Sequence, residues 1–169
     1  ISKTLTEYSN TLELFKDERI LLFLRNIEKV NVFINKDYRI FCDKTHHKWW
    51  LKDFDVSLTN EIIEYLNDQI IEGNEEVPTK FANIAKCKIS YASLVKDGKI
   101  SLLDDAKLFN YLPLIINLNF PFIINTDFIP DGEREGLINN KWNEFLLEEA
   151  GKNFIKYLQE TVRDKKREN

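Results

Sequence analysis

The chain has 169 residues, of which 43% are hydrophobic and 31% are charged, and its formal net charge is -4. This length and composition fit one globular domain with a core of its own, and they exclude a chain that is disordered over most of its length. The acidic balance argues against a general binder of nucleic acid or anionic membranes, because such proteins need a surplus of cations. A nucleic-acid accessory domain that uses the basic tail after Val162 is therefore the least favoured function.

The sequence contains no methionine and only two cysteines, Cys42 and Cys87. Two cysteines are too few for a disulfide framework, and no signal peptide or apolar stretch of membrane-spanning length is present. These features indicate a protein of the reducing cytoplasm that does not associate with a membrane. Because the chain does not begin with methionine, we expect residues 1–169 to be one domain of a longer protein, with 163–169 as a solvated tail.

Hydrophobic spacing predicts the elements of the first half of the chain: a helix that can break near Asp17, a three-stranded meander and a second helix. The expected ranges are 11–27 for the first helix, 29–34, 38–42 and 47–56 for the strands, and 58–71 for the second helix. Thr59 is the expected N-cap of the second helix, because its hydroxyl can accept a hydrogen bond from a free backbone N–H of the first turn.

The second half of the chain is predicted to contain a β-hairpin that turns at Asp97-Gly98, a short helix, a central strand and a long C-terminal helix. Pro121 predicts an irregularity or an edge partway along the central strand. The expected ranges are 88–95 and 99–102 for the hairpin, 104–111 for the short helix, 114–125 for the strand and 142–161 for the last helix. Asn139 or Asn140 is the expected N-cap of that helix. Together these elements predict an α+β fold, a two-layer sandwich of mainly antiparallel strands and helices with a long C-terminal helix.

The polar loop that starts at Pro130, between the central strand and the last helix, carries Arg134 between two glutamates. A guanidinium is always charged and presents a rigid fork of donors, so an arginine at this place can hold an anionic oxygen. The alternative is a surface ion pair with a carboxylate of the same loop, which would be worth under about 1 kcal/mol. The carboxylates available for such a pair are Asp131, Glu133 and Glu135.

Trp49 and Trp50 form a second candidate site. Neighbouring residues of a strand point to opposite faces of a sheet, so we expect one tryptophan in the core and the other exposed at an interface. An exposed aromatic cluster here would be a docking patch for a partner protein.

Cys42, His46 and His47 lie close enough in the sequence to be considered as metal ligands. A closed zinc site needs four ligands and nothing nearby completes the set, so solvated histidines at the end of a hairpin are the favoured interpretation and no metal is expected. The sequence also lacks a Gly-rich phosphate-binding loop, a Gly-x-Ser-x-Gly motif and a paired-histidine zinc helix. The chain is therefore not expected to be an enzyme on its own.

The sequence around Arg134 resembles one group of proteins. Residues 127–137, Asp-Phe-Ile-Pro-Asp-Gly-Glu-Arg-Glu-Gly-Leu, follow Phe-Pro-Phe-Ile-Ile-Asn and precede Trp-Asn-Glu-Phe-Leu. This stretch resembles the segment after the nucleotide-binding domain in large bacterial sacsin-like, heat-shock-chaperone-type ATPases of the GHKL superfamily. Further blocks that occur in the order expected for that group are 21–27, 77–80 and 108–113.

The same loop is similar to the Asp-Leu-Pro-Leu-Asn-x-Ser-Arg-Glu-x-Leu motif in the middle domain of the ninety-kilodalton heat-shock chaperones. The matching positions are Asp127, Arg134, Glu135 and Leu137. The sequence departs from that motif where the proline is displaced by one place, where Asp-Gly-Glu replaces Asn-x-Ser, and at Ile138, where the chaperones carry glutamine.

The resemblance implies a middle, or transducer-like, domain whose core resembles the second domain of a small-subunit ribosomal protein. It also implies that Arg134 reaches the γ-phosphate of ATP held by a preceding domain. ATP and magnesium would belong to that adjacent ATP-binding domain, so this chain would bind no cofactor and would contribute to hydrolysis only within the full-length protein. The implied function is relay of nucleotide state to client- or partner-binding regions. The alternative is a non-catalytic protein-interaction module that uses the aromatic surface near Trp49 and Trp50.

Overall fold

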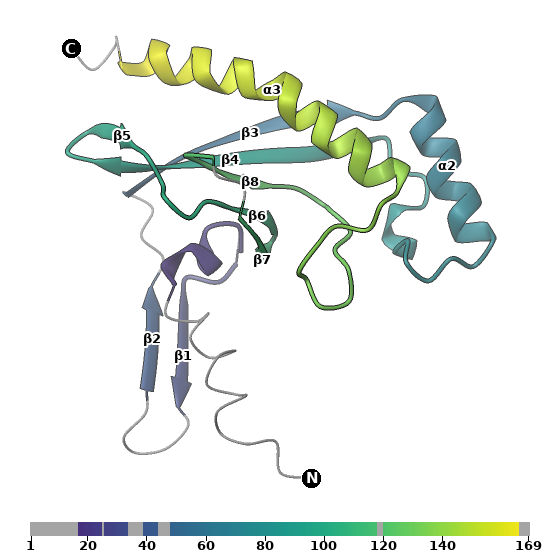
Figure 1. Ribbon diagram of the computed structural model, residues 1–169, viewed down its shortest axis with the longest axis horizontal. Helices are drawn as coiled ribbons and strands as arrows, with labels where there is room; N and C mark the ends of the chain where they lie inside the picture. Colours follow the sequence, from purple (N-terminus) through teal and green to yellow (C-terminus); the bar gives the residue numbers. More distant parts are fainter. Residues whose placement is uncertain (1–16, 25, 34–38, 44–47, 118–119, 166–169) are drawn as a thin grey trace.

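A computed structural model describes residues 17–24, 26–33, 39–43, 48–117 and 120–165 (Figure 1). In this part of the chain the fold is α+β: a mostly antiparallel six-stranded sheet packs against two α-helices, one of them the long C-terminal helix. The fold class predicted from the sequence is therefore confirmed.

The helices and strands have the following bounds. The α-helices are α2 (Asn60–Ile71) and α3 (Lys141–Lys165), and the 3-10 helices are η2 (Glu18–Leu21) and η4 (Thr79–Phe81). The strands are β1 (Lys29–Phe33), β2 (Arg39–Asp43), β3 (Trp49–Ser57), β4 (Lys86–Lys96), β5 (Lys99–Ser101), β6 (Lys107–Asn110), β7 (Leu112–Asn117) and β8 (Ile123–Asn125).

The strand order of the large sheet is β3-β4-β8-β6-β7, and β5 pairs with the end of β4. All of its pairs are antiparallel except β6 with β8, which run parallel. The strand β8 has only three residues and all are buried, so it forms the middle of the sheet despite its length. It joins the β3-β4-β5 half of the sheet to the β6-β7 half.

The local turn and cap predictions are confirmed. Asp97 and Gly98 have φ values of 51° and 68°, which the two-residue turn of the β4–β5 hairpin requires. Thr59 accepts a hydrogen bond from the backbone N–H of Ile62 at the start of α2. The side chain of Asn140 accepts from the N–H of Asn143, 2.8 Å away, at the start of α3.

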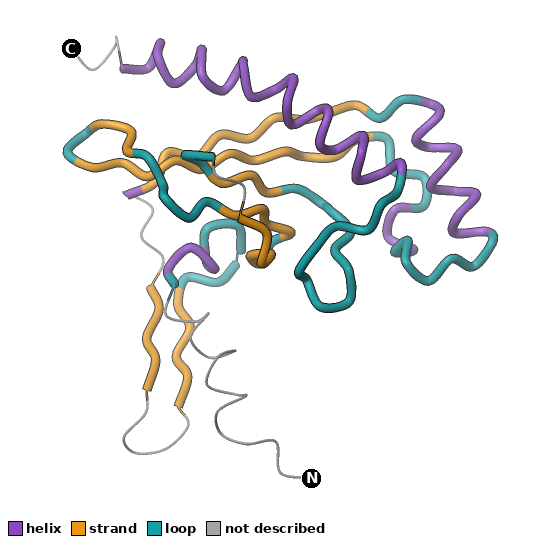
Figure 2. The backbone as a smooth tube through the Cα atoms, in the orientation of Figure 1, coloured by secondary structure: helices purple, strands orange, loops and turns teal. Residues whose placement is uncertain are grey.

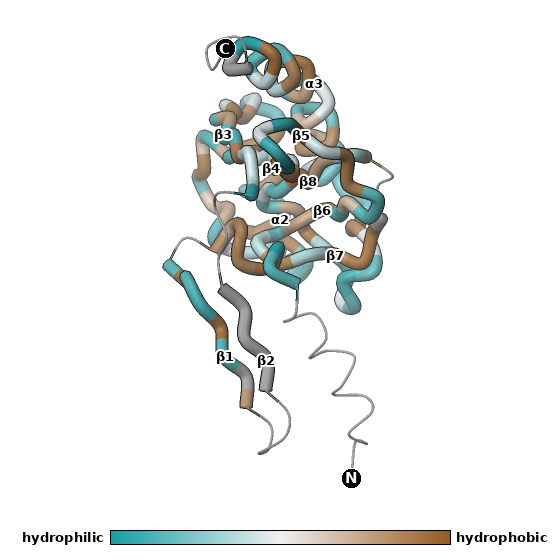
Figure 3. The backbone as a smooth tube through the Cα atoms, turned by 90° about the vertical axis from the view of Figure 1, so that its left-hand side faces the viewer, coloured by the Kyte–Doolittle hydropathy of each residue, from teal (hydrophilic) through white to brown (hydrophobic). Residues whose placement is uncertain are grey.

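The β1–β2 hairpin is confirmed, but the meander with a third strand is wrong. β1 and β2 form a sheet of their own, while β3 pairs with β4 along its whole length, from Trp49 opposite Leu94 to Ser57 opposite Lys86. The nine-residue β3 finds a partner of matching length in the eleven-residue β4. The hairpin lies on the side of the sheet away from α3 (Figures 1 and 3).

Two further predictions are wrong. The segment expected as a helix at 104–111 contains strand β6, because it pairs with β7 and β8 inside the sheet. The strand expected at 114–125 is two strands, β7 and β8, on either side of β6, and the expected irregularity at Pro121 lies between them in the sequence. The helix expected at 11–27 begins outside the described residues. In the described part of this range only η2 is helical, with Asp17 as its cap.

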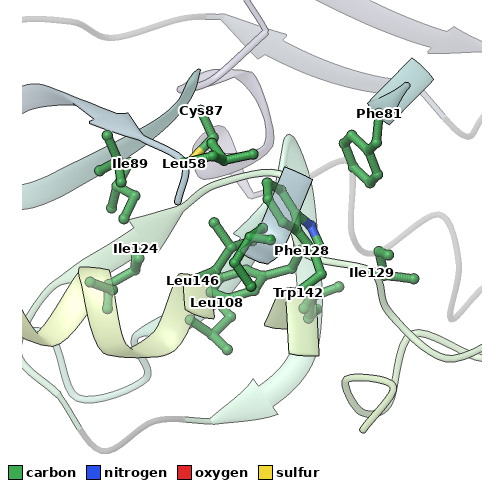
Figure 4. Packing of buried hydrophobic residues seen from close by; sticks show 14 of the residues in the cluster. Leu58, Phe81, Cys87, Ile89, Leu108, Ile124, Phe128, Ile129, Trp142 and Leu146 are labelled. Atoms are coloured by element: carbon green, nitrogen blue, oxygen red, sulfur yellow. The ribbon is translucent and has the colours of Figure 1, made fainter. Parts of the chain in front are cut away.

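One face of the large sheet, the helix face, carries α2 and α3 and holds the main core (Figure 4). Trp142 and Leu146 of α3 are fully buried against it, and the hydroxyl of Tyr91 in β4 donates to the carbonyl oxygen of Ala150, 2.5 Å away. The opposite face, the second face, is partly covered by the turn after η2. Its smaller apolar cluster comprises Leu22, Phe23, Trp49, Ala92, Phe109 and Ile123.

Candidate functional site

The loop that joins β8 to α3, residues 126–140, is drawn in teal in Figure 2. One side chain, that of Asn143, holds it at its base. The amide of Asn143 donates to the carbonyl oxygens of Ile129 and Ile138, at 2.8 and 2.7 Å, and accepts from the N–H of Ile129 at 2.9 Å. Pro130 and Leu137 form an isolated bridge just above. Because Asn143 is 3% exposed, these hydrogen bonds lie away from solvent. They hold the segment that enters the loop, at Ile129, beside the segment that leaves it, at Ile138.

The tip of the loop is ordered by Asp131. Its carbonyl oxygen accepts from the N–H of Arg134, and its side chain accepts from the N–H of Glu135. A Cβ at Gly136 would lie 2.8 Å from the Asp131 carboxylate, so a larger residue there would displace it. Arg134 has a φ of 60°, a left-handed conformation that is unfavourable for a residue with a side chain. The hydrogen bonds of the tip hold Arg134 in it.

Arg134 is anchored to the turn between β6 and β7. Its Nη2 donates to the carbonyl oxygen of Leu112 at 3.0 Å and to that of Asn110 at 3.4 Å. Its own carbonyl oxygen accepts from the N–H of Ile115 at 2.9 Å. Partial burial lowers the pKa of Arg134, but the guanidinium stays charged at neutral pH.

The sequence-based alternative, an ion pair within the loop, is wrong. No described carboxylate forms an ion pair with Arg134, although Asp131, Glu133 and Glu135 are its neighbours in the sequence. The Nε and Nη1 donors of Arg134 also have no hydrogen-bond partner in the part of the chain that is described. The loop thus holds the guanidinium of Arg134 in a fixed place, with two hydrogen-bond donors available for a ligand.

Trp49 and Trp50 point to opposite faces of the sheet, as predicted. Trp49 is 7% exposed and belongs to the cluster of the second face, whereas Trp50 is half-buried against the core of the helix face. The two side chains therefore do not form the exposed aromatic cluster that the docking alternative requires.

The three residues considered as metal ligands cannot be placed: His46 and His47 lie outside the described residues, as does the side chain of Cys42. Across the described ranges, no group of three or more His, Cys, Asp and Glu side chains could hold a metal ion. Cys87 is a buried free thiol. Burial, with smaller effects from the charges of Asp127 and Glu149, raises its pKa to about 12.

A pocket of about 440 Å³ on the second face was not foreseen from the sequence. Its described lining comprises Leu22, Phe23, Leu51, Lys52, Asp53, Lys88, Ser90, Tyr111, Asn125, Thr126 and Asp127. The only early signal was alternation: Lys88 and Ser90 in β4, and Leu51 and Asp53 in β3, each lie two residues apart and so share a face. That β8 brings Asn125 beside them depends on strand order, which the sequence did not reveal.

Comparison with protein-family models, with curated proteins and with solved structures finds no match. Among the helices that the structure describes, none is both long enough and apolar enough to cross a membrane.

Proposed function

We propose that this chain is a relay domain of a larger ATP-driven, chaperone-like protein of the cytoplasm, in which Arg134 contacts a phosphate oxygen of a nucleotide. The nucleotide and its magnesium ion would be held by a neighbouring domain. The observation that carries this proposal is an arginine without a carboxylate partner in the described chain, on a loop tip ordered by backbone hydrogen bonds. A second support for the proposal is the resemblance of the loop to the middle domain of heat-shock chaperones.

The geometry of Arg134 suits an anion. Nη2 is used by two carbonyl oxygens, which fixes the plane of the guanidinium, while the Nε and Nη1 donors have no partner in the described residues. A fixed guanidinium loses little side-chain freedom when it binds a phosphate, and its charge-assisted hydrogen bonds are about twice as strong as neutral ones. Partial desolvation strengthens the attraction further.

A chain of contacts leads from Arg134 into the sheet. The carbonyl groups that it binds flank Tyr111, whose backbone N–H donates to the side chain of Asn125 in β8, 2.8 Å away. A change in the position of Arg134 would therefore act on the turn between β6 and β7 and on the middle of the sheet. This is the path by which nucleotide state would reach regions that bind a client or partner protein.

The test is ATP hydrolysis by the parent protein, or by its ATP-binding domain with and without this chain. Arg134→Gly is the informative variant, because glycine suits the left-handed backbone at this position and removes the charge without adding strain. We expect turnover to fall on the order of 100-fold or more, as when a residue that stabilises transition-state charge is removed.

Arg163→Ala is the matched control, because Arg163 is exposed near the end of α3, far from the loop in sequence. It should leave turnover unchanged. Turnover that is indifferent to Arg134→Gly, with the variant folded by circular dichroism, would remove Arg134 from the ATP reaction and with it the relay proposed here.

A further inference from the structure

The pocket on the second face has a polar floor that crosses three strands. Asp53 in β3 stands opposite Ser90 in β4, and Ser90 stands opposite Asn125 in β8. Since neighbouring strands lie about 4.8 Å apart, the three side chains form a row about 10 Å long on one face of the sheet. Thr126 follows directly after Asn125 and also lines the pocket.

Two hydroxyl groups of this floor are buried. Ser90 is 5% exposed and Thr126 is 1% exposed, and the Thr126 hydroxyl has no hydrogen-bond partner in the described part of the protein. The Thr126 oxygen is closed to solvent, so a ligand in the pocket does not reach it. The Ser90 hydroxyl also makes no hydrogen bond within the described residues, but it is not enclosed in this way. Most buried polar side chains in proteins have at least one partner, so the Ser90 hydroxyl in the lining of a pocket points to a polar ligand. Asn125 uses its Oδ1 to accept from Tyr111, which leaves its NH₂ group as a donor.

The charged residues of the lining are balanced. Lys88 is paired with Asp53 at 3.0 Å, and Lys52 with Glu160 at 2.6 Å. Asp127 is paired with Lys80, at 2.8 Å. An anionic ligand would compete with carboxylates for the lysines, and a cationic ligand would compete with lysines for the carboxylates. This arrangement favours an uncharged ligand.

The remaining wall of the pocket is apolar. It consists of Leu22, Phe23 and Leu51, and the half-exposed ring of Tyr111 also lines the pocket. The pocket thus combines carboxylate, amide and hydroxyl groups on its floor with aliphatic and aromatic side chains on its wall. A volume of about 440 Å³ lies within the usual range for small-molecule sites.

We propose that this pocket binds a neutral polyhydroxylated molecule of sugar type. Such a molecule has hydroxyl groups that can both donate to Asp53 and accept from Asn125, and a face of C–H groups that can pack on Phe23 and Leu51. Its hydroxyl groups also supply the partner that the Ser90 side chain lacks within the described protein. The site does not involve Arg134, and it stands whether or not the chain relays nucleotide state.

The experiment is a titration of the ¹⁵N-labelled chain with glucose, galactose, mannose and ribose, followed by amide chemical shifts. We expect saturable shifts at the amides of Ser90, Asn125 and Thr126 with at least one of these sugars. Ser90→Ala removes the hydroxyl that faces the ligand, and it should weaken the binding about tenfold, as the loss of one buried hydrogen bond predicts. Asp53→Asn has nearly the same shape without the charge, and as the second variant it should weaken binding in the same way.

Asp55→Asn is the matched control, because Asp55 shares the strand and face of Asp53 but is absent from the described lining of the pocket. It should leave the titration unchanged. Glucose 6-phosphate and glucosamine serve as the anionic and cationic probes and should bind more weakly than glucose. The proposal is overturned if no neutral sugar shifts these amides, if a charged probe binds more tightly, or if both variants bind as the wild type does.

Discussion

The helix face and the second face of the large sheet differ in how their hydroxyl groups are satisfied. Indole N–H groups do not follow this difference, because that of Trp50 on the helix face has no partner in the described residues. On the helix face the hydroxyl of Tyr157 donates to Ser93 at 2.5 Å, and that of Tyr91 to the carbonyl oxygen of Ala150. On the second face the Ser90 hydroxyl makes no hydrogen bond within the described chain, and the ion pair of Asp53 with Lys88 is open to solvent.

This difference indicates that the hydroxyl groups of the helix face contribute to stability, whereas that of Ser90 on the second face is available for ligand binding. A polar group that is satisfied inside the fold contributes to stability, whereas a buried group without an internal partner lowers it and can be compensated by a ligand. We therefore expect substitutions on the helix face to destabilise the protein. Equivalent substitutions on the second face should cost little or should even stabilise it.

The largest expected effect is in the apolar core of the helix face. Leu146→Ala should lower the free energy of unfolding by about 2–5 kcal/mol, because Leu146 is fully buried under α3. Leu51→Ala is the counterpart on the second face, where the side chain is half-buried, and should cost about 1–2 kcal/mol. Urea denaturation of both variants measures the difference, and equal losses would contradict the proposed division between the faces.

Asn143→Ala should cost about 2–3 kcal/mol, because it removes three buried hydrogen bonds and leaves backbone groups of Ile129 and Ile138 without partners. The loop that carries Arg134 should lose its fixed shape at the same time. Thermal unfolding gives the stability, and limited proteolysis between 130 and 137 reports the loop. The exposed Asn139 provides the control: Asn139→Ala should change neither the thermal stability nor the rate of proteolysis in the loop.

The buried thiol of Cys87 makes stability depend on alkaline pH. The folded protein keeps its proton up to a pKa of about 12, while the unfolded chain loses it near 9.0, so stability is complete below pH 9 and falls as the pH rises towards 12. At pH 10 the loss should be on the order of 1 kcal/mol relative to pH 7. Denaturation at both pH values measures it. In Cys87→Ala this component should disappear, and an unchanged slope would exclude the thiol as its source.

The smallest expected effects have opposite signs for a buried hydroxyl with a partner and for one without. Ser93→Val should destabilise the protein by about 1 kcal/mol, because it leaves the buried hydroxyl of Tyr157 without its acceptor. Thr126→Val should stabilise it by about 1 kcal/mol, because it removes a buried hydroxyl that has no partner in the described chain. Calorimetric melting of the two variants decides the signs. A loss of stability in Thr126→Val would mean that its hydroxyl is satisfied in the free protein.

Local chemistry was predictable from the sequence, and strand pairing was not. The caps at Thr59 and Asn140 and the Asp97-Gly98 turn act within a few residues, so their patterns identify them directly. The segment after Asp104 has the acidic start of a helix, but Asp105 instead forms a bidentate ion pair with the distant Arg19. A pattern within a few residues of Asp105 cannot predict an ion pair with a residue so far away in the sequence.

The candidate sites show the same difference between local features, which could be predicted, and contacts that depend on strand pairing, which could not. Arg134 could be selected from the sequence, because a charged residue beside turn-forming residues is a local feature. Its carbonyl partners in the turn between β6 and β7 could not be foreseen while residues 104–111 were expected to be a helix. The pocket was missed entirely, because Ser90 and Asn125 become neighbours only when β8 lies against β4.

The shortness of β8 has a mechanical consequence. The two halves of the sheet are held together by pairs at only three residues on the β4 side and two on the β6 side. A twist applied to β6 and β7 is concentrated at this narrow junction instead of being spread over a broad sheet. Few backbone pairs therefore resist a change in the angle between the halves, and Arg134 is bound to the turn between β6 and β7, at the outer edge of one half.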